Sequence, residues 1–259
     1  MPVSPKKIFW KTFNSIDAAL KFPGLKPGEI AVQLGFDMSA PVTSDLFLLE
    51  KRVRPGGIVF GIDPDRRNVE IAQKIIDDKK LNIRLINMAV YSEKGTTELL
   101  LGKKTSWNQL KNIPLDTEVE FEKQTVKIEM DSFDSIVKNY GIDIQAISHI
   151  NITVNGAEYF ALKGMEKLLN TVKDISITAV AGRYDDSGTI NGTPDHILIA
   201  DLLKKSGFKV RFKRIHQSFW WGFIVNFLIK GKWVFGKNNY GIIMAAKGNK
   251  KLKWYQSFS

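Results

Sequence analysis

The stretch that decides the fold is Arg54-Pro-Gly-Gly-Ile-Val-Phe-Gly-Ile-Asp-Pro64, which leads from a turn into an apolar strand and ends on an acidic residue. Proline and paired glycines favour a turn at its start. Residues 58–62 carry no polar side chain, which is typical of a strand buried on both faces. Asp63 and Pro64 then open a helical pattern to about residue 78, with Asp63 placed as its N-cap.

The same succession of a strand and a helix is repeated along the chain. The predicted strands are 29–34, 58–62, 83–86, 146–153, 175–181, 209–214 and 242–246, with two more at 95–101 and 119–130. The predicted helices are 42–53, 63–78, 131–139, 155–169 and 194–205. Strands separated by helical patterns imply crossovers that bury both faces of a largely parallel sheet. The sequence therefore predicts an α/β, doubly wound, Rossmann-like fold with a mostly parallel seven-stranded sheet and helices on both faces.

The length and composition favour a single domain. The 259 residues, 44% of them hydrophobic, are enough for one sizeable core, and the chain contains no internal repeat. We expect one domain over 1–259. Its predicted parts are an amphipathic N-terminal helix at 1–25, a core at 26–214, a basic aromatic insertion at 215–239, and a last strand with a basic tail at 240–259.

Several classes of protein are excluded by composition. The chain has no cysteine, so it has no disulfide framework, no thiolate nucleophile and no cysteine-ligated metal. We expect no metal site. The N-terminal lysines interrupt any secretory signal. The longest uncharged stretch, 215–229, is 15 residues long, whereas a membrane-spanning helix needs about 20. These features predict a cytoplasmic protein.

The ends of the first two predicted strands point to a nucleoside. In sheets of this kind, ligands bind beyond the carboxyl ends of the strands. Gly35 permits a tight turn after the first strand, but a single glycine is no dinucleotide fingerprint. Asp63 follows the second strand and is placed to accept hydrogen bonds from both hydroxyls of a ribose. The alternative is that Asp63 only caps a helix.

Three further segments resemble the FkbM methyltransferase family. They are Thr125-Val-Lys-Ile-Glu-Met-Asp131, Ile150-Asn-Ile-Thr-Val-Asn-Gly-Ala-Glu-Tyr-Phe-Ala-Leu-Lys-Gly164, and Asn87-Met-Ala-Val90 with Gly95. The turn at 54–57 also resembles the one before the second strand of S-adenosylmethionine-dependent methyltransferases. The resemblance covers about residues 28–214. It implies S-adenosylmethionine as cofactor and O-methyl transfer to a sugar or lipid-linked hydroxyl acceptor.

With this resemblance, the strand ends give a set of expected cofactor-binding residues. They are Gln33, Gly35, Asp37, Asp63, Asn87, Asn151 and Thr153. Glu158, which the family pattern retains together with Gly156, is either a site residue or an ordinary acid in the first turn of a helix.

The departures from the family pattern fall on its charged positions. Gln33 replaces the usual aspartate of the first strand, and Ser39 replaces a glycine. Asn151, Thr153 and Asn155 stand where the family has lysine, aspartate and glutamate. Neutral side chains attract a sulfonium cation less, although their oxygens still accept hydrogen bonds. A second hypothesis is therefore a catalytically degenerate protein of this fold that acts as a binding or scaffold module.

Methyl transfer to a hydroxyl is helped by a nearby general base. The candidates are His149 near the end of a strand, and Tyr184 and Asp185 in the loop after the next strand. His196, beside Asp195 at the start of a helix, is a further candidate. Each has a structural alternative: a core histidine, a solvated loop or a helix cap.

Basic residues are concentrated in the C-terminal part of the chain. The formal net charge is +11, yet no acidic residue follows Asp201, and residues 202–259 carry 13 Lys and Arg and four of the six tryptophans. Aromatic and basic side chains together favour an anionic membrane surface as partner, which would place the protein peripherally on the inner membrane. The residues expected to bind it are Trp220, Trp221, Trp233, Lys230 and Lys232.

Two other interpretations of 215–239 remain open. The segment packs in the core or at a homodimer interface, or it stacks on nucleic-acid bases. The chain carries no recognised nucleic-acid-binding module, which makes nucleic acid the weaker alternative.

Overall fold

The computed structural model describes residues 22, 24–39, 41, 44–103, 105–114, 120–183, 188–214, 241–250 and 252. Three predictions lie outside the described residues: the predicted N-terminal helix, except for residues 22, 24 and 25, the insertion at 215–239, and the candidate bases Tyr184 and Asp185. Within these residues, no helix is long and apolar enough to cross a membrane.

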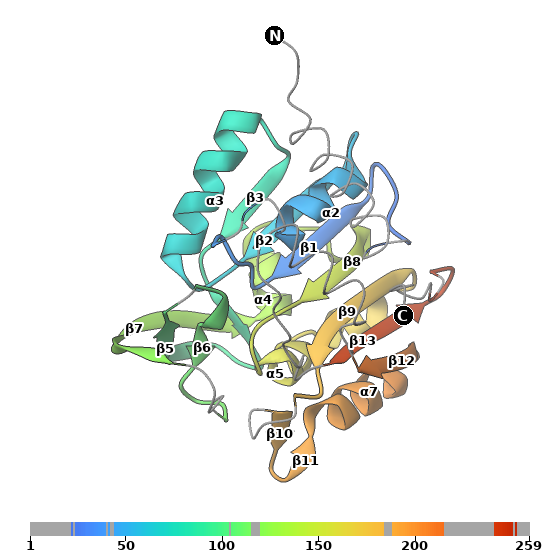
Figure 1. Cartoon of the computed structure of the whole chain (residues 1–259). Helices are drawn as coiled ribbons and strands as arrows, with labels where there is room; N and C mark the ends of the chain where they lie inside the picture. Colours follow the sequence, from blue (N-terminus) through green and yellow to red (C-terminus); the bar gives the residue numbers. More distant parts are fainter. Residues whose placement is uncertain are drawn as a thin grey trace, which may run out of the picture.

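The core of the fold is a seven-stranded sheet in the order β12-β13-β9-β8-β1-β2-β3 (Figure 1). Its strands are β1 (Ile30–Leu34), β2 (Ile58–Ile62), β3 (Ile83–Ile86), β8 (Ile147–Ile152), β9 (Ile175–Ala181), β12 (Lys209–Arg214) and β13 (Gly241–Lys247). β13 runs antiparallel to both of its neighbours, and the other pairs are parallel. The predicted α/β fold and its seven-stranded, mostly parallel sheet are confirmed.

Helices cover both faces of this sheet. On one face α2 (Asp45–Val53) and α3 (Arg66–Lys79) share a core with the side chains of Ala31 and Val59. On the other face lie α4 (Phe133–Asn139), α5 (Glu158–Lys163), α6 (Glu166–Thr171) and α7 (Asp195–Lys205), which share a core with Val32 and Phe60. The side chains of successive strand residues thus point into opposite cores, because side chains alternate between the two faces along a strand.

A second, four-stranded sheet lies beside the carboxyl ends of the main strands, at the lower left of Figure 1. Its order is β4-β7-β5-β6, with β4 (Ala89–Tyr91), β5 (Gly95–Gly102), β6 (Gln109–Leu110) and β7 (Phe121–Ser132). A short hairpin of β10 (Thr189–Ile190) and β11 (Thr193–Pro194) precedes α7, and 3-10 turns span η2 (Thr105–Trp107) and η3 (Ile144–Ala146). The strands at 95–101 and 119–130 were expected, and the structure shows that they build a separate sheet.

Two local predictions were wrong. The N-cap of α3 is Asp65, whose carboxylate accepts a hydrogen bond from the backbone N–H of Arg67, and not Asp63. The helix predicted over 155–169 is two helices, α5 and α6, that meet at Gly164. A Cβ on Gly164 would lie 2.0 Å from the carbonyl oxygen of Tyr91, so the chain turns where it passes against β4.

Candidate active site

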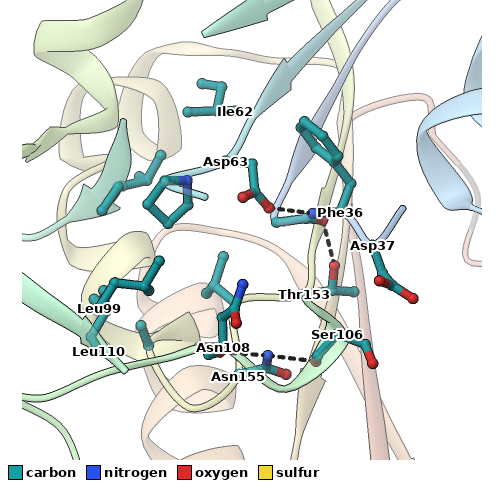
Figure 2. Close-up of a pocket in the computed structure, with 16 residues that line it drawn as sticks. Phe36, Asp37, Ile62, Asp63, Leu99, Ser106, Asn108, Leu110, Thr153 and Asn155 are labelled. Atoms are coloured by element: carbon teal, nitrogen blue, oxygen red, sulfur yellow. Dashed lines mark hydrogen bonds between the residues drawn. The ribbon is translucent and has the colours of Figure 1, made fainter. Parts of the chain in front are cut away.

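A pocket lies where the carboxyl ends of β1, β2 and β8 meet the small sheet (Figure 2). Its volume is about 210 Å³, which is below the roughly 300–1,000 Å³ of pockets for whole drug-sized ligands. It is therefore sized for one part of an extended ligand, such as a nucleoside. Its lining residues are Gly35, Phe36, Asp37, Ile62, Asp63, Pro64, Ala89, Val90, Leu99, Ser106, Asn108, Leu110, Thr153, Val154, Asn155 and Ala157.

Asp63 joins the ends of β1 and β2 in the wall of the pocket (Figure 2). One carboxylate oxygen accepts the backbone N–H of Phe36 and the other that of Asp65, both at 2.8 Å. The residue is 5% exposed, and burial raises the pKa of its carboxyl to about 7 although both hydrogen bonds oppose this. Each carboxylate oxygen has two lone pairs, so Asp63 retains acceptor capacity for ligand hydroxyls.

Gly35 allows the ends of β1 and β8 to approach each other at the floor of the pocket. Its φ of +69° lies in the left-handed region, and a Cβ there would lie 2.2 Å from the carbonyl oxygen of Thr153. Its N–H donates to the carbonyl oxygen of Ile62 at 2.9 Å, which also fixes the turn to β2. Only glycine fits this conformation and this space.

A hydrogen-bond network built around the neutral side chains of Gln33 and Asn151 lies behind this floor. Gln33 and Asn151 are register partners on β1 and β8, and the Asn151 amide donates to the Gln33 side-chain oxygen at 2.8 Å and to a carboxylate oxygen of Asp45 on α2 at 3.2 Å. The Gln33 amide donates to the Gly35 carbonyl at 2.6 Å and to the Thr153 hydroxyl oxygen at 3.0 Å. The network thus holds the ends of β1 and β8 together behind the pocket.

The seven expected cofactor-binding residues occupy three different places. Gly35, Asp37, Asp63 and Thr153 line the pocket. Gln33 and Asn151 are buried behind it. Asn87 is exposed at the end of β3, and its amide donates to the backbone carbonyl of Asp63 at 2.9 Å.

Sequence reasoning missed the wall that the small sheet contributes. Leu99 and Leu110 form its apolar part, and the loop between them adds Ser106 and Asn108. The Asn155 amide, at the end of β8, donates to the carbonyl oxygens of Ser106 at 2.9 Å and Asn108 at 2.8 Å, which ties this loop to the main sheet (Figure 2). Asn155 was noted only as a departure from the family's glutamate.

Glu158 shapes the turn that carries Asn155. Its two carboxylate oxygens accept the backbone N–H groups of Val154 at 3.1 Å and Gly156 at 2.8 Å. The residue is buried, and burial raises the pKa of its carboxyl. Glu158 therefore acts on the pocket by positioning the turn after β8, at which Gly156 has a φ of +100°.

His149, one of the two candidate bases that lie among the described residues, does not line the pocket. It is buried near the start of β8, where its Nδ1 lies 2.8 Å from the Ser176 hydroxyl oxygen and its ring meets the ring of Phe22 edge-on. Burial lowers the pKa of its imidazole to about 3. These contacts favour the structural interpretation of His149. In the described part of the chain, no group of three or more His, Cys, Asp and Glu side chains is placed to hold a metal ion.

The strand order and the position of the pocket are those of a Rossmann-like methyltransferase. The family described as the methyltransferase FkbM domain matches residues 33–210, and the chain belongs to this family. The resemblance seen in the sequence is thereby confirmed, and with it S-adenosylmethionine as the cofactor of this class of methyltransferase.

Solved methyltransferase structures resemble the chain at low sequence identity. Fibrillarin of Aeropyrum pernix, with natively bound S-adenosyl-L-methionine, is 10% identical over 91% of this chain and 74% of its own, with a TM-score of 0.47. A SAM-dependent methyltransferase of Aquifex aeolicus is 15% identical over 95% of this chain and 98% of its own, with a TM-score of 0.41. No curated protein matches the sequence.

Proposed function

We propose that the chain transfers a methyl group from S-adenosylmethionine to a hydroxyl of a sugar or lipid-linked acceptor, at an anionic membrane surface. The observation that carries the proposal is the buried Asp63 carboxyl, which faces the pocket at the carboxyl edge of the sheet with acceptor capacity to spare. The nature of the acceptor rests on the resemblance of residues 150–164 to the FkbM pattern.

The residues around the pocket fit the cofactor. Asp63 would accept the ribose hydroxyls, and the apolar wall of Leu99 and Leu110 would pack against the adenine ring. The amino-acid part would extend along the glycine turn at Gly35 toward Thr153. When bound, the cofactor supplies a methyl group made electrophilic by its sulfonium; the chain orients the two reactants, which by itself lowers the barrier.

We expect Asp63→Ala to weaken S-adenosylmethionine binding by at least about 1.5 kcal/mol, or roughly tenfold, because it removes a charged hydrogen-bond acceptor. The wild-type affinity should also rise as the pH is raised through about 7, since the buried carboxyl then becomes an acceptor-only carboxylate. Titration calorimetry between pH 6 and 8.5 measures both effects. Asp78→Ala, on the exposed side of α3, is the control and should bind normally.

An affinity that is unchanged in Asp63→Ala at every pH would remove the ribose assignment. If Asp63→Ala lowers affinity but the pH dependence survives in it, another group titrates, and the raised pKa of Asp63 has no part in binding.

The second candidate function, a binding or scaffold module, is favoured by the neutral residues at the strand ends. At positions 33 and 151, the neutral residues change the charge of the site less than the sequence alone suggests. Gln33 and Asn151 face each other, so the family's aspartate and lysine would be neighbours there, and the neutral pair leaves the local net charge unchanged. Thr153 and Asn155 do remove two negative charges from the pocket wall.

Calorimetry with S-adenosylmethionine and with S-adenosylhomocysteine separates the two functions. An enzyme should bind both compounds, because substrate and product share the nucleoside that the pocket is built for. A module should bind neither.

The membrane part of the proposal rests on the charge distribution of the sequence. We expect the protein to co-sediment with anionic vesicles at low salt, each lysine near the surface contributing about 1 kcal/mol. This attraction should fade as the screening length falls from about 10 Å at 0.1 M to about 3 Å at 1 M. Insertion of tryptophan rings should leave a salt-resistant remainder that the double variant Trp220→Ala/Trp221→Ala loses.

Neutral vesicles are the control for this experiment. A protein that ignores anionic vesicles at low salt has no membrane role, and segment 215–239 is then better interpreted as core or dimer interface.

A further inference from the structure

A second group of polar side chains lies on the same edge of the sheet as the pocket, one strand further along. Asp195 and His196 open helix α7, directly beyond the ends of β9 and β12. The ring of Phe212, on β12, stacks on the ring of His196. Neither Asp195 nor His196 lines the pocket. Each of the two has a buried polar atom that makes no hydrogen bond to any described residue.

Asp195 is a buried carboxyl with one oxygen in use. Oδ1 accepts the backbone N–H of Gly182, at the end of β9, at 2.7 Å. Oδ2 is buried and has no hydrogen-bond partner within the described ranges. The residue is 2% exposed, and burial raises the pKa of its carboxyl. Burying a carboxylate oxygen without a hydrogen bond costs free energy, which indicates that Asp195 has a function beyond stabilising the fold.

His196 is held with one ring nitrogen directed at this carboxyl. Its Nδ1 is 3.9 Å from Asp195 Oδ1, is buried, and makes no hydrogen bond to any described residue. Its ring stacks on Phe212 with centroids 4.4 Å apart and planes 18° apart, which fixes the ring orientation. The side chain is 22% exposed, so the ring is reachable from solvent.

The charge state of His196 suits a base. Burial lowers the pKa of its imidazole, the positive charge of Arg214 lowers it further, and the negative charge of Asp195 partly opposes both. The imidazole is therefore neutral at pH 7 and able to take up a proton.

Arg183 links this pair to the pocket. It follows Gly182 at the end of β9, and its guanidinium donates to the side-chain oxygen of Asn155 at 3.3 Å. Asn155 lines the pocket from the end of β8. Because β8 and β9 are adjacent parallel strands, about 4.8 Å apart, an acceptor bound over β9 would lie next to a ligand bound over β8.

We propose that His196 is the catalytic base of the methyl transfer and that Asp195 is its positioning residue. This inference rests on the proposed function. The O–H bond of the acceptor breaks and its proton passes to His196 Nε2, while the acceptor oxygen bonds to the methyl carbon. The carbon–sulfur bond breaks with its electron pair left on sulfur. The carboxylate of Asp195, 3.9 Å from Nδ1, stabilises by its charge the imidazolium that forms.

Arg183, beside this pair, indicates which kind of acceptor the site takes. Arg183 has five N–H donors in a planar fork, and its hydrogen bond to Asn155 uses one of them. The remaining donors suit oxygens that neighbour the reacting hydroxyl. An acceptor with several adjacent oxygens, as in a sugar ring, matches this arrangement better than a simple alcohol.

Carbethoxylation with diethyl pyrocarbonate tests the proposal without a known acceptor, since the reagent acylates neutral, accessible imidazoles. Peptide mass spectrometry follows His196 in the presence of S-adenosylhomocysteine, with a panel of methyl glycosides as probes. We expect His196 to react at neutral pH and at least one glycoside to slow the reaction severalfold. Asp195→Asn keeps an oxygen for Gly182 but removes the charge, and should shift the pH dependence of the reaction to lower pH. Asp201→Asn, exposed on the same helix, should change nothing.

Two outcomes would overturn the proposal. His196 reacts only in urea, or it reacts in the folded protein but no glycoside protects it although the nucleoside product binds. Failure of the proposed function is a different result, in which calorimetry shows no nucleoside binding. Glycoside protection measured without the nucleoside then still reports whether the sugar site exists.

Once a glycoside is found that accepts the methyl group, His196→Gln should lower kcat by about 10²- to 10⁴-fold, the usual contribution of a general base. The affinity for S-adenosylmethionine should be unchanged, and the acidic limb of the pH profile should disappear. An unaltered pH profile in His196→Gln would assign the base to another group.

Discussion

Gly35→Ala should lose about 2–5 kcal/mol of folding free energy, together with its affinity for S-adenosylmethionine. Two costs add. The left-handed backbone, with φ of +69°, costs an alanine about 1–2 kcal/mol. The new Cβ would lie 2.2 Å from the Thr153 carbonyl oxygen, and such overpacking costs about 1–3 kcal/mol. The backbone at Thr153 cannot yield easily, because its N–H donates to the Leu34 carbonyl at 2.9 Å.

Gly28→Ala is a matched control for this effect. Gly28 also has a positive φ, +84°, but a Cβ there would meet no atom within 4 Å. The control should therefore show the backbone cost alone and keep its cofactor affinity. Urea unfolding and calorimetry on both variants measure the difference. Equal losses in the two variants would mean that the close approach of β1 and β8 has no energetic importance.

The main sheet was predictable because most of its strands are short, largely apolar runs bounded by turn residues, as at 58–62. The small sheet was not. β5 and β7 pair residues as distant in sequence as Gly95 and Met130, and β4 joins β7 in parallel. Local sequence patterns predict that such strands exist, but which strands pair with one another depends on contacts between residues distant in sequence.

Asp63 shows where local reasoning fails at the site. The sequence Asp63-Pro64 is typical of a helix start, and the cap was assigned accordingly. In the structure its carboxylate instead accepts the N–H of Phe36, from the turn after another strand. Asp65, two residues on, is free to cap α3. The position of Asp63 at the pocket was therefore predictable, but the contact that holds it there was not.

The pocket wall was unpredictable for a related reason. Asn108 and Asn155 are 47 residues apart, and they meet through a side-chain amide and a backbone carbonyl. Asparagine in a loop has no distinctive pattern. Glu158, whose carboxylate holds the turn that carries Asn155, was a sequence signal for this region together with Gly156, since the family pattern retains both.

The second large effect is acid sensitivity that comes from His149. Its imidazole is buried and neutral, with the pKa lowered from 6.5 to about 3 by desolvation and, less strongly, by the charge of Lys250. In the unfolded chain it titrates near 6.5. Between these two values the unfolded state binds one more proton than the folded state, so stability rises with pH across this range. The contribution is fully present above about 6.5 and is lost as the pH falls toward 3.

At about 1.4 kcal/mol per pH unit, this single group accounts for a loss on the order of 5 kcal/mol by pH 3. His149→Gln keeps a polar side chain near Ser176 but cannot be protonated, so its stability should fall less steeply between pH 6 and 4. Urea midpoints at half-unit steps, for both proteins, give the difference in slope, which should approach one proton. Parallel slopes would show that water reaches the imidazole in the folded state, and that the core between β8 and Phe22 is not closed. His149 is thus a test of how tightly the chain is packed on the α2 face of the sheet.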